Sequence, residues 1–215
     1  MHITRRKTRQ IQVGKVKIGG DAPVSVQSMC STDTRDTAAT IEQIRQLEAA
    51  GCEVIRVAVP DDEAAAALLK IKAAMTVPLI ADIHFDHRLA LKAAKVVDCV
   101  RINPGNIGAW WKVEEVIKAV NDHNIPIRVG VNGGSLERDL LDKYGWPSPE
   151  ALAESALNAV HALEDVGFTN MKVSLKASDV HHAIDAYWLF AHQSDYPLHI
   201  GITEAGTAMT GAVKS

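Results

Sequence analysis

Several short apolar segments of this 215-residue chain carry charged or amide side chains at or near their C-terminal ends. Arg101 and Asn103 are two residues apart in one such segment, and Asp82 and His84 have the same spacing in another. Because successive side chains of a β-strand point to opposite faces, residues two apart project to the same side. The candidate site residues are Arg56, Asp82, His84, Arg101, Asn103, Arg128, Asn132, Lys172, Ser174, Lys176 and Glu204.

Cations outnumber acids in this set. Five members are Arg or Lys, whereas Asp82 and Glu204 are the two carboxylates. A surplus of positive charge removed from water is costly, and an anionic ligand would relieve it. Guanidinium groups match phosphate oxygens in a bidentate manner, so the set predicts a substrate with more than one phosphate. The amides, Ser174 and a neutral His84 could bind hydroxyl or bridging oxygens. For any one residue, a structural ion pair without a ligand explains the pattern equally well.

A metal site is a weaker interpretation of the same residues. The Asp-x-His sequence at 82–84 has His87 nearby, but this spacing is not specific. The cysteines are Cys30, Cys52 and Cys99, which are far apart and form no Cys-x-x-Cys motif. Their positions argue against a disulfide framework and against a metal site built from thiols. The sequence therefore predicts no metal ligands in the candidate set.

Composition restricts the possible partners. The chain is 47% hydrophobic and 23% charged, as is usual for a globular protein, and its net charge is −3. This charge gives no reason to expect binding to nucleic acid or to an acidic membrane surface. No apolar run reaches the roughly 18 residues of a membrane span, and no signal-peptide core follows the basic N-terminus. We therefore expect a cytoplasmic protein.

Strand-like segments alternate with helical ones along the chain. The expected strands cover residues 24–29, 54–59, 78–83, 99–102, 126–131, 170–175 and 197–202. Helical spacing of apolar residues predicts helices near 34–50, 61–74, 88–97, 110–120, 150–166 and 178–192, with a longer connection at 136–149. Strict alternation, with connections too long for hairpins, implies a parallel sheet.

Seven βα units in series favour an α/β fold of the TIM (β/α)8 type over an open doubly wound sheet. The barrel, assigned to residues 23–215, is incomplete because no eighth strand or last helix is evident. A small β-hairpin within residues 1–22 is expected to precede it as a lid or plug. Pro104-Gly105 suits the central positions of a type II turn with positive φ at Gly105. The open edge suggests a fragment of a longer protein, or a cover supplied by something else.

Seven motifs give the chain a family resemblance. They are Val-Gln-Ser-Met at 26–29, Ile-Arg-Val-Ala-Val-Pro at 55–60, Ala-Asp-Ile-His-Phe-Asp at 81–86, Arg-Ile-Asn-Pro-Gly-Asn-Ile-Gly at 101–108, Arg-Val-Gly-Val-Asn-Gly-Gly-Ser-Leu at 128–136, Lys-Val-Ser-Leu-Lys-Ala-Ser-Asp at 172–179 and Gly-Ile-Thr-Glu-Ala-Gly at 201–206. In this order, from about Arg6 to Ser215, the chain resembles the 4-hydroxy-3-methylbut-2-enyl diphosphate synthases of isoprenoid biosynthesis.

The resemblance implies an oxidoreductase that converts 2-C-methyl-D-erythritol 2,4-cyclodiphosphate to 4-hydroxy-3-methylbut-2-enyl diphosphate. It implies that a diphosphate is held by Arg56, Arg101, Arg128 and Lys176, with His84 and Asn132 as neighbouring polar contacts and Lys172 deeper in its strand. Asp82 and Glu204 would lie near the reacting carbons, where they could deliver a proton or contact a hydroxyl.

The resemblance also implies components that this chain lacks. In the family, a C-terminal domain holds a [4Fe-4S] cluster with three cysteines and a glutamate, and that domain is absent here. The cysteines of this chain lie outside any cluster motif of the family. Ferredoxin or flavodoxin would donate electrons, and the full-length protein would be a homodimer. The chain by itself is accordingly predicted to be inactive.

Two other interpretations stay open. The chain could be a catalytically inactive truncated barrel that only binds a phosphorylated ligand. It could also be another phosphate-binding barrel enzyme, such as a relative of the pteroate synthases, although nothing in the sequence marks a pterin pocket.

Overall fold

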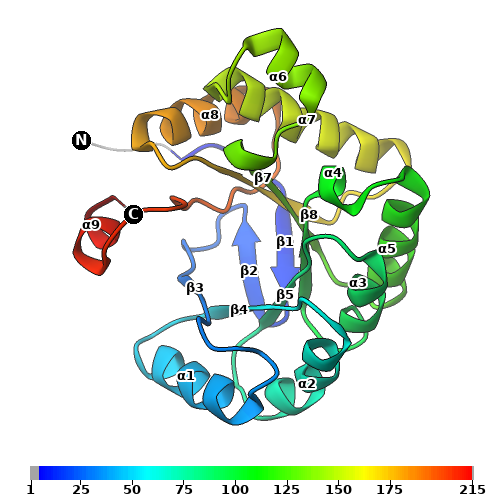
Figure 1. Ribbon diagram of the computed structural model, residues 1–215, viewed down its shortest axis with the longest axis vertical. Coiled ribbons are helices and arrows are strands. Elements are labelled where there is room, and N and C mark those ends of the chain that lie inside the picture. The colour runs from blue at the N-terminus through cyan, green and yellow to red at the C-terminus, as the bar shows by residue number, and fades with distance from the viewer. Residues whose placement is uncertain (1–4, 215) are drawn as a thin grey trace.

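The computed structural model of the chain describes residues 5–214 and shows a curled parallel sheet with helices outside it (Figure 1). The strands pair in chain order, and every neighbouring pair is parallel. They are β3 (Gln27–Met29), β4 (Val54–Ala58), β5 (Leu79–Asp82), β6 (Cys99–Ile102), β7 (Ile127–Asn132) and β8 (Met171–Lys176). The predicted α/β barrel architecture is confirmed.

Helices follow the strands and cover the outer face of the sheet (Figure 1). The longer ones are α1 (Thr37–Ala49), α2 (Asp62–Ala73), α3 (His87–Ala93), α5 (Trp110–Asp122), α7 (Pro149–Asp165) and α8 (Val180–Gln193). Several begin at a side chain that accepts a backbone N–H, as Asp61 does from Ala64 at 2.9 Å. Outward strand residues such as Ile55 and Val129 are fully buried under these helices. This burial of apolar area is the main stabilisation of the fold.

The barrel is open on one side. In Figure 1, the ring of strands is interrupted between β3 and the C-terminal segment that leads to α9 (Ala208–Lys214). The prediction of a seventh strand at 197–202 is wrong, because this segment makes one isolated parallel bridge, between Val173 and Leu198. This segment lies beside β8 on one edge, and no described strand lies on its other edge to extend the ladder.

Three local predictions also need correction. The first strand begins at Gln27 rather than Val24, which is 83% exposed beside the open edge. Residues 104–107 form the short helix α4 (Pro104–Ile107) instead of a type II turn: Asn103 Oδ1 accepts from the N–H of Gly105 at 3.2 Å. The connection at 136–149 contains α6 (Arg138–Tyr144), which follows the 3₁₀ helix η1 (Gly133–Ser135).

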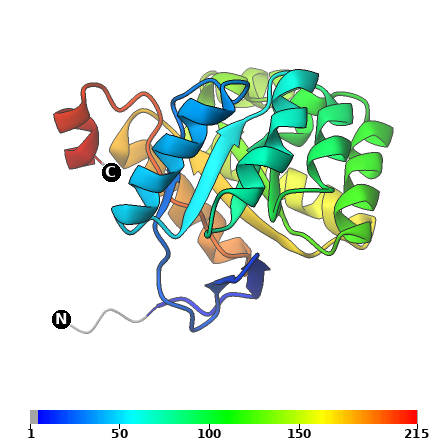
Figure 2. The same cartoon turned by 90° about the horizontal axis from the view of Figure 1, so that it is seen from below.

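The N-terminal hairpin closes one end of the barrel. Strands β1 (Gln10–Val13) and β2 (Val16–Gly19) pair antiparallel and lie below the sheet in Figure 2. We call the apolar contact between hairpin and barrel the floor; its residues are Ile11, Val13, Val54, Ile80 and Cys99, all buried. The hairpin therefore packs as the plug that the sequence predicts.

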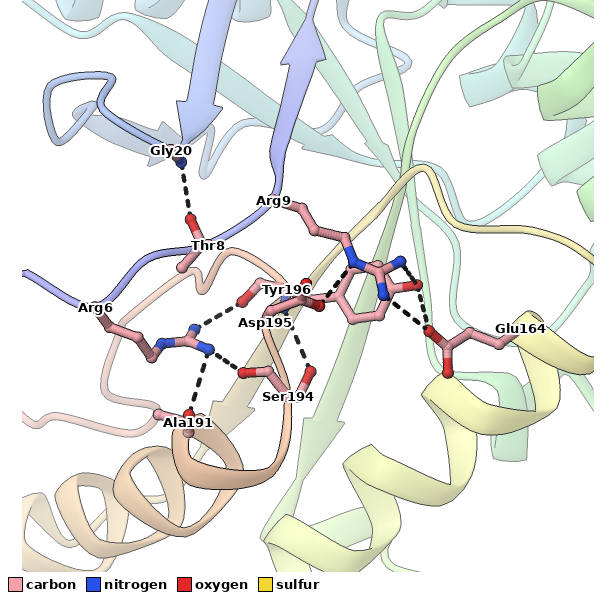
Figure 3. A network of polar contacts seen from close by, with 9 residues as sticks. All are labelled: Arg6, Thr8, Arg9, Gly20, Glu164, Ala191, Ser194, Asp195 and Tyr196. Atoms are coloured by element: carbon pink, nitrogen blue, oxygen red, sulfur yellow. Dashed lines mark hydrogen bonds and ion pairs between the residues drawn. The ribbon is translucent and has the colours of Figure 1, made fainter.

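Polar contacts anchor the chain just before the hairpin (Figure 3). Arg9 forms ion pairs with Asp195 at 2.7 Å and Glu164 at 3.5 Å. Arg6 donates to the carbonyl oxygens of Ser194 and Tyr196 after the end of α8. These contacts join residues that are between 155 and 190 positions apart in the sequence, so they hold the plug against the last helices of the barrel.

Candidate functional site

Parallel strand pairing brings the predicted cations together inside the barrel. Asp82, Arg101, Arg128 and Lys172 are successive register partners across β5, β6, β7 and β8. Their side chains project to the same side of the sheet, two residues above the floor positions in β5 and β6. We call this group, with the neighbouring cations of β4 and β8, the cup: Arg56, Asp82, Arg101, Arg128, Lys172 and Lys176.

Asp82 is the buried acid of the cup. One carboxylate oxygen accepts from Arg101 Nη1 at 2.9 Å, and the other lies 3.4 Å from Arg56 Nε and 3.7 Å from His84 Nε2. Burial by itself would raise the pKa of Asp82, but the contact with His84 and the two guanidinium charges outweigh it. The net effect holds this pKa well below its usual range, so Asp82 is ionised at neutral pH.

The position of Arg101 depends on a glycine in the next strand. A Cβ atom on Gly130 would lie 2.5 Å from Arg101 Nε and 2.8 Å from Nη2, so only glycine leaves room for this guanidinium. The Asn132 amide, with its oxygen turned toward Arg101, accepts from Nη2 at 3.0 Å. Arg101 Nε is buried and has no hydrogen-bond partner in residues 5–214.

Arg128 is fully buried and pairs with no carboxylate of residues 5–214. Its Nε and Nη2 atoms donate to Ser174 Oγ at 3.2 and 3.0 Å, and Nη1 has no partner in the part of the chain that the structure describes. Burial, followed by repulsion from Arg56 and Arg101, lowers the pKa of Arg128 to about 9. An unsatisfied buried donor is costly, and an acceptor atom of a ligand could satisfy it.

The two lysines of β8 extend the same surplus. Lys172 is 1% exposed, and burial lowers its pKa to about 8. Burial and the charges of Arg128, Arg56 and Arg101 lower the pKa of Lys176 to about 8. Neither lysine forms an ion pair with a carboxylate within residues 5–214. Five cations thus share one buried acid.

The remaining candidates lie at the mouth of the barrel. His84, Asn132, Lys176 and Glu204 line one cleft of about 550 Å³ above the cup. Glu204 is exposed, and its φ of 52° places it in the left-handed region, which non-glycine residues rarely adopt. Asn103 is instead engaged within the protein, since it caps α4 and donates to Ser135 Oγ at 3.2 Å.

His199 is a cup neighbour that the sequence reasoning did not select. Burial first, and then the charges of Arg128 and both β8 lysines, hold the pKa of its imidazole far below the ordinary value. The available signal was weak: a histidine inside a predicted strand, two residues before the Gly-Ile-Thr-Glu sequence at 201–204. Only the tertiary arrangement shows that this ring is surrounded by cations.

The described residues do not fit an iron–sulfur cluster. No group of three His, Cys, Asp or Glu side chains that could hold a metal ion occurs in residues 5–214. The cysteines are all buried and free, and burial raises the pKa of Cys30 to about 11 and also raises that of Cys99. Cluster ligation requires converging thiolates, which these separate, buried cysteines do not supply.

Comparison with solved structures identifies the same architecture. The chain superposes on a type I 3-dehydroquinate dehydratase from Clostridium difficile with a TM-score of 0.69 and 12% identity, covering 97% of this chain and 84% of that one. It superposes on a dihydropteroate synthase from Xanthomonas albilineans with a TM-score of 0.66 and 11% identity, covering 95% and 84%. At such identities the likeness shows the fold alone.

Sequence comparison is more specific. Two curated relatives, each named 4-hydroxy-3-methylbut-2-en-1-yl diphosphate synthase (flavodoxin), are 59% identical to this chain. The relative from Geobacter sulfurreducens matches 98% of the chain and the one from Pseudomonas paraeruginosa 99%. The chain spans about 60% of the length of these relatives. Because the family model described as the GcpE TIM-barrel domain matches residues 8–215, the chain belongs to the GcpE TIM-barrel family.

Proposed function

We propose that the chain is the substrate-binding barrel of an oxidoreductase that converts 2-C-methyl-D-erythritol 2,4-cyclodiphosphate to 4-hydroxy-3-methylbut-2-enyl diphosphate. The single observation that carries this proposal is the cup, in which five cations surround one buried acid. Family membership and the printed names of the relatives support the reaction. A doubly phosphorylated ligand would neutralise the surplus charge and fill the two unsatisfied guanidinium positions.

Each side chain has a distinct task in this proposal. Arg101 and Arg128 present their free N–H groups to the phosphate oxygens, and Lys176 contributes charge near the mouth. Because Asp82 is held ionised, it would orient Arg56 and Arg101. It would also accept a hydrogen bond from a substrate hydroxyl instead of donating a proton. Glu204, which lines the cleft, is the other candidate for contact with the departing hydroxyl or for proton delivery to it.

The reducing step needs a group that these residues do not hold. A [4Fe-4S] cluster would have to be bound by another polypeptide segment, either of a longer protein or of a partner in a homodimer. The relatives' name makes flavodoxin the first candidate for the electron donor, with ferredoxin as the second. Accordingly, we expect the chain of 215 residues to bind substrate without turnover.

None of the described helices is long and apolar enough to span a bilayer.

The alternative is a barrel that binds a phosphorylated ligand and has no part in catalysis. Both proposals predict ligand binding, so activity must separate them. If the chain, supplied with a separately produced cluster-containing segment of a relative and reduced flavodoxin, converts the cyclic diphosphate, the first proposal holds. If it binds the diphosphate but never supports turnover in that mixture, the alternative holds.

Binding itself is tested by Arg128→Ala and isothermal titration calorimetry with the cyclic diphosphate. We expect a loss of about 2–5 kcal/mol of binding free energy, as for one side of a buried charge pair. Arg138→Ala, at the start of α6 and outside the cup, is the matched control and should bind normally. An unchanged dissociation constant for Arg128→Ala would remove this residue from the proposed site.

A further inference from the structure

His199 is held rigidly on the inner wall of the barrel. Its backbone N–H donates to the Val173 carbonyl at 2.8 Å, and its carbonyl accepts from the Tyr187 hydroxyl at 2.6 Å. Its neighbour Leu198 packs against the outer core. Because adjacent residues of an extended segment point to opposite sides, the imidazole of His199 faces the interior.

The ring lies close to both lysines of β8. His199 Nε2 is 3.9 Å, and Lys176 Nζ 3.5 Å, from the point that a Cβ atom on Gly201 would occupy. His199 and Lys172 also line one cavity of about 400 Å³, whose lining includes no Asp or Glu. Within residues 5–214, neither ring nitrogen of His199 and no side-chain atom of Lys172 forms a hydrogen bond. The half-buried His199 ring and the buried Lys172 side chain therefore both line this cavity, and neither has a hydrogen-bond partner among the described residues.

Most of the charged groups around the ring are cations. The charged and titratable groups that face it are Arg56 on β4, Arg128 on β7, Lys172 and Lys176 on β8 and Tyr187 on α8, with Arg5 and Arg6 lining the cavity and Asp82 as the acid of the cup. Burial and these cations keep the imidazole neutral in the free protein. An anion in the cup would cancel the repulsion.

Resting on the function proposed above, we propose that His199 is a further binding residue for the phosphorylated ligand: its neutral ring takes up one proton from solvent as the ligand binds and donates a hydrogen bond to a phosphoryl oxygen. Binding and protonation are then linked, so each favours the other. Affinity must rise as pH falls through the pKa of the ring in the complex. An unperturbed imidazole titrates near 6.5, so the rise is expected between about pH 8 and 6.

Two measurements on the same protein test this inference. The first is nitrogen NMR of the ¹⁵N-histidine-labelled chain with and without inorganic diphosphate at pH 6.5, which reports whether the His199 ring is neutral or protonated. The second is the dissociation constant of diphosphate from pH 6 to 8.5 for the wild type, His199→Gln and His199→Leu. The ligand's own ionisation affects all variants alike and cancels in their ratios.

We expect the ring to be neutral without diphosphate and protonated with it. His199→Gln, which can donate but cannot gain a proton, should match the wild type at pH 8.5 and bind at least tenfold more weakly at pH 6. His199→Leu should be weaker throughout. His181→Gln, an exposed histidine of α8, is the control and should follow the wild type at every pH.

The outcomes separate the two proposals. Failure of the wild type to bind diphosphate would overturn the proposed function, and this inference with it. If Arg128→Ala abolishes binding but His199→Gln follows the wild type and the ring stays neutral, the cup is an anion site and the role of His199 is refuted. If the variants do not fold, the NMR spectrum of the wild type decides by itself.

Discussion

The floor and the cup are neighbouring layers of the same barrel, yet they follow opposite physical rules. On β5 and β6 they are two residues apart: Ile80 is followed by Asp82, and Cys99 by Arg101. Floor side chains are sealed beneath a hairpin and are stabilised by leaving water. The cup side chains of Asp82, Arg101, Arg128 and Lys172 are as buried as the floor but charged, and Arg101 and Arg128 each leave one buried donor atom without a partner in residues 5–214. The cup therefore costs stability unless a ligand is bound.

This contrast separates stability from function along one strand. The floor holds the barrel shut at one end, where a loss of packing should affect folding and leave binding intact. The cup should show the opposite effects. Removing its surplus positive charge should stabilise the free protein and weaken its affinity for the ligand. Asp82 is the exception within the cup, since it neutralises two arginines that would otherwise be buried without a counter-charge.

The largest expected effect is for Asp82→Asn. It leaves Arg56 and Arg101 buried without an acid, and breaking one side of a buried pair costs about 3–5 kcal/mol. Urea unfolding at pH 7 measures the loss. Glu114→Gln, at an exposed position of α5, is the control and should change little. A stability equal to that of the wild type would mean that Asp82 is not the counter-ion of the cup.

A substitution in the floor should change stability through packing alone. Ile80→Ala removes a fully buried side chain beneath the cup and should cost about 3 kcal/mol of unfolding free energy. The dissociation constant for diphosphate, measured on the folded fraction, should be unchanged. Ile184→Ala, on the exposed face of α8, should have little effect on either quantity. A large change in affinity for Ile80→Ala would show that the two layers are coupled.

Lys172→Met should stabilise the free protein by about 1–3 kcal/mol at pH 7, because a buried cation is replaced by an apolar side chain of similar length. Its pH dependence has a defined sign. The pKa of Lys172 is about 8 in the folded protein and near 10.4 when unfolded. Between these values the unfolded state binds more protons, so wild-type stability rises with pH.

Lys172→Met should remove part of that rise, as seen in urea midpoints from pH 7.5 to 10. Lys118→Met, an exposed position of α5, is the matched control and should keep the wild-type slope. The variant should also bind diphosphate more weakly than the wild type. A destabilised Lys172→Met protein would show that this lysine has a stabilising partner and does not belong to the surplus.

The smallest expected change in stability comes from Gly130→Ala, at about 1 kcal/mol, the lower end for overpacking a filled interior. Its effect on binding should be larger, because the added methyl would displace the Arg101 guanidinium from its present position. Gly211→Ala, in α9, adds a Cβ atom that meets only an ordinary contact at 3.5 Å and is the control. Calorimetry with diphosphate checks both. Equal affinities for the two variants would show that the placement of Arg101 is not critical.

Much of this architecture could be read from the chain alone. Alternation of short apolar strands with helices predicts the parallel sheet, because hairpins cannot connect parallel strands. Charged residues such as Arg101 and Arg128 in apolar strands indicate a candidate binding site, because burying a charge is costly unless it has a partner. The short helix at Pro104 and the failed strand at 197–202 were mispredicted, because side-chain capping and edge pairing override local propensity.

By itself, the sequence determined which residues are charged, how far apart they are within each strand, and that cations exceed acids. Only the tertiary structure decided which of them share Asp82, which guanidinium atoms lack partners, and that His199 joins the group. The physical reason is that spacing within a strand is set by backbone geometry, whereas contacts between strands depend on register. Register is fixed by the packing of the whole barrel.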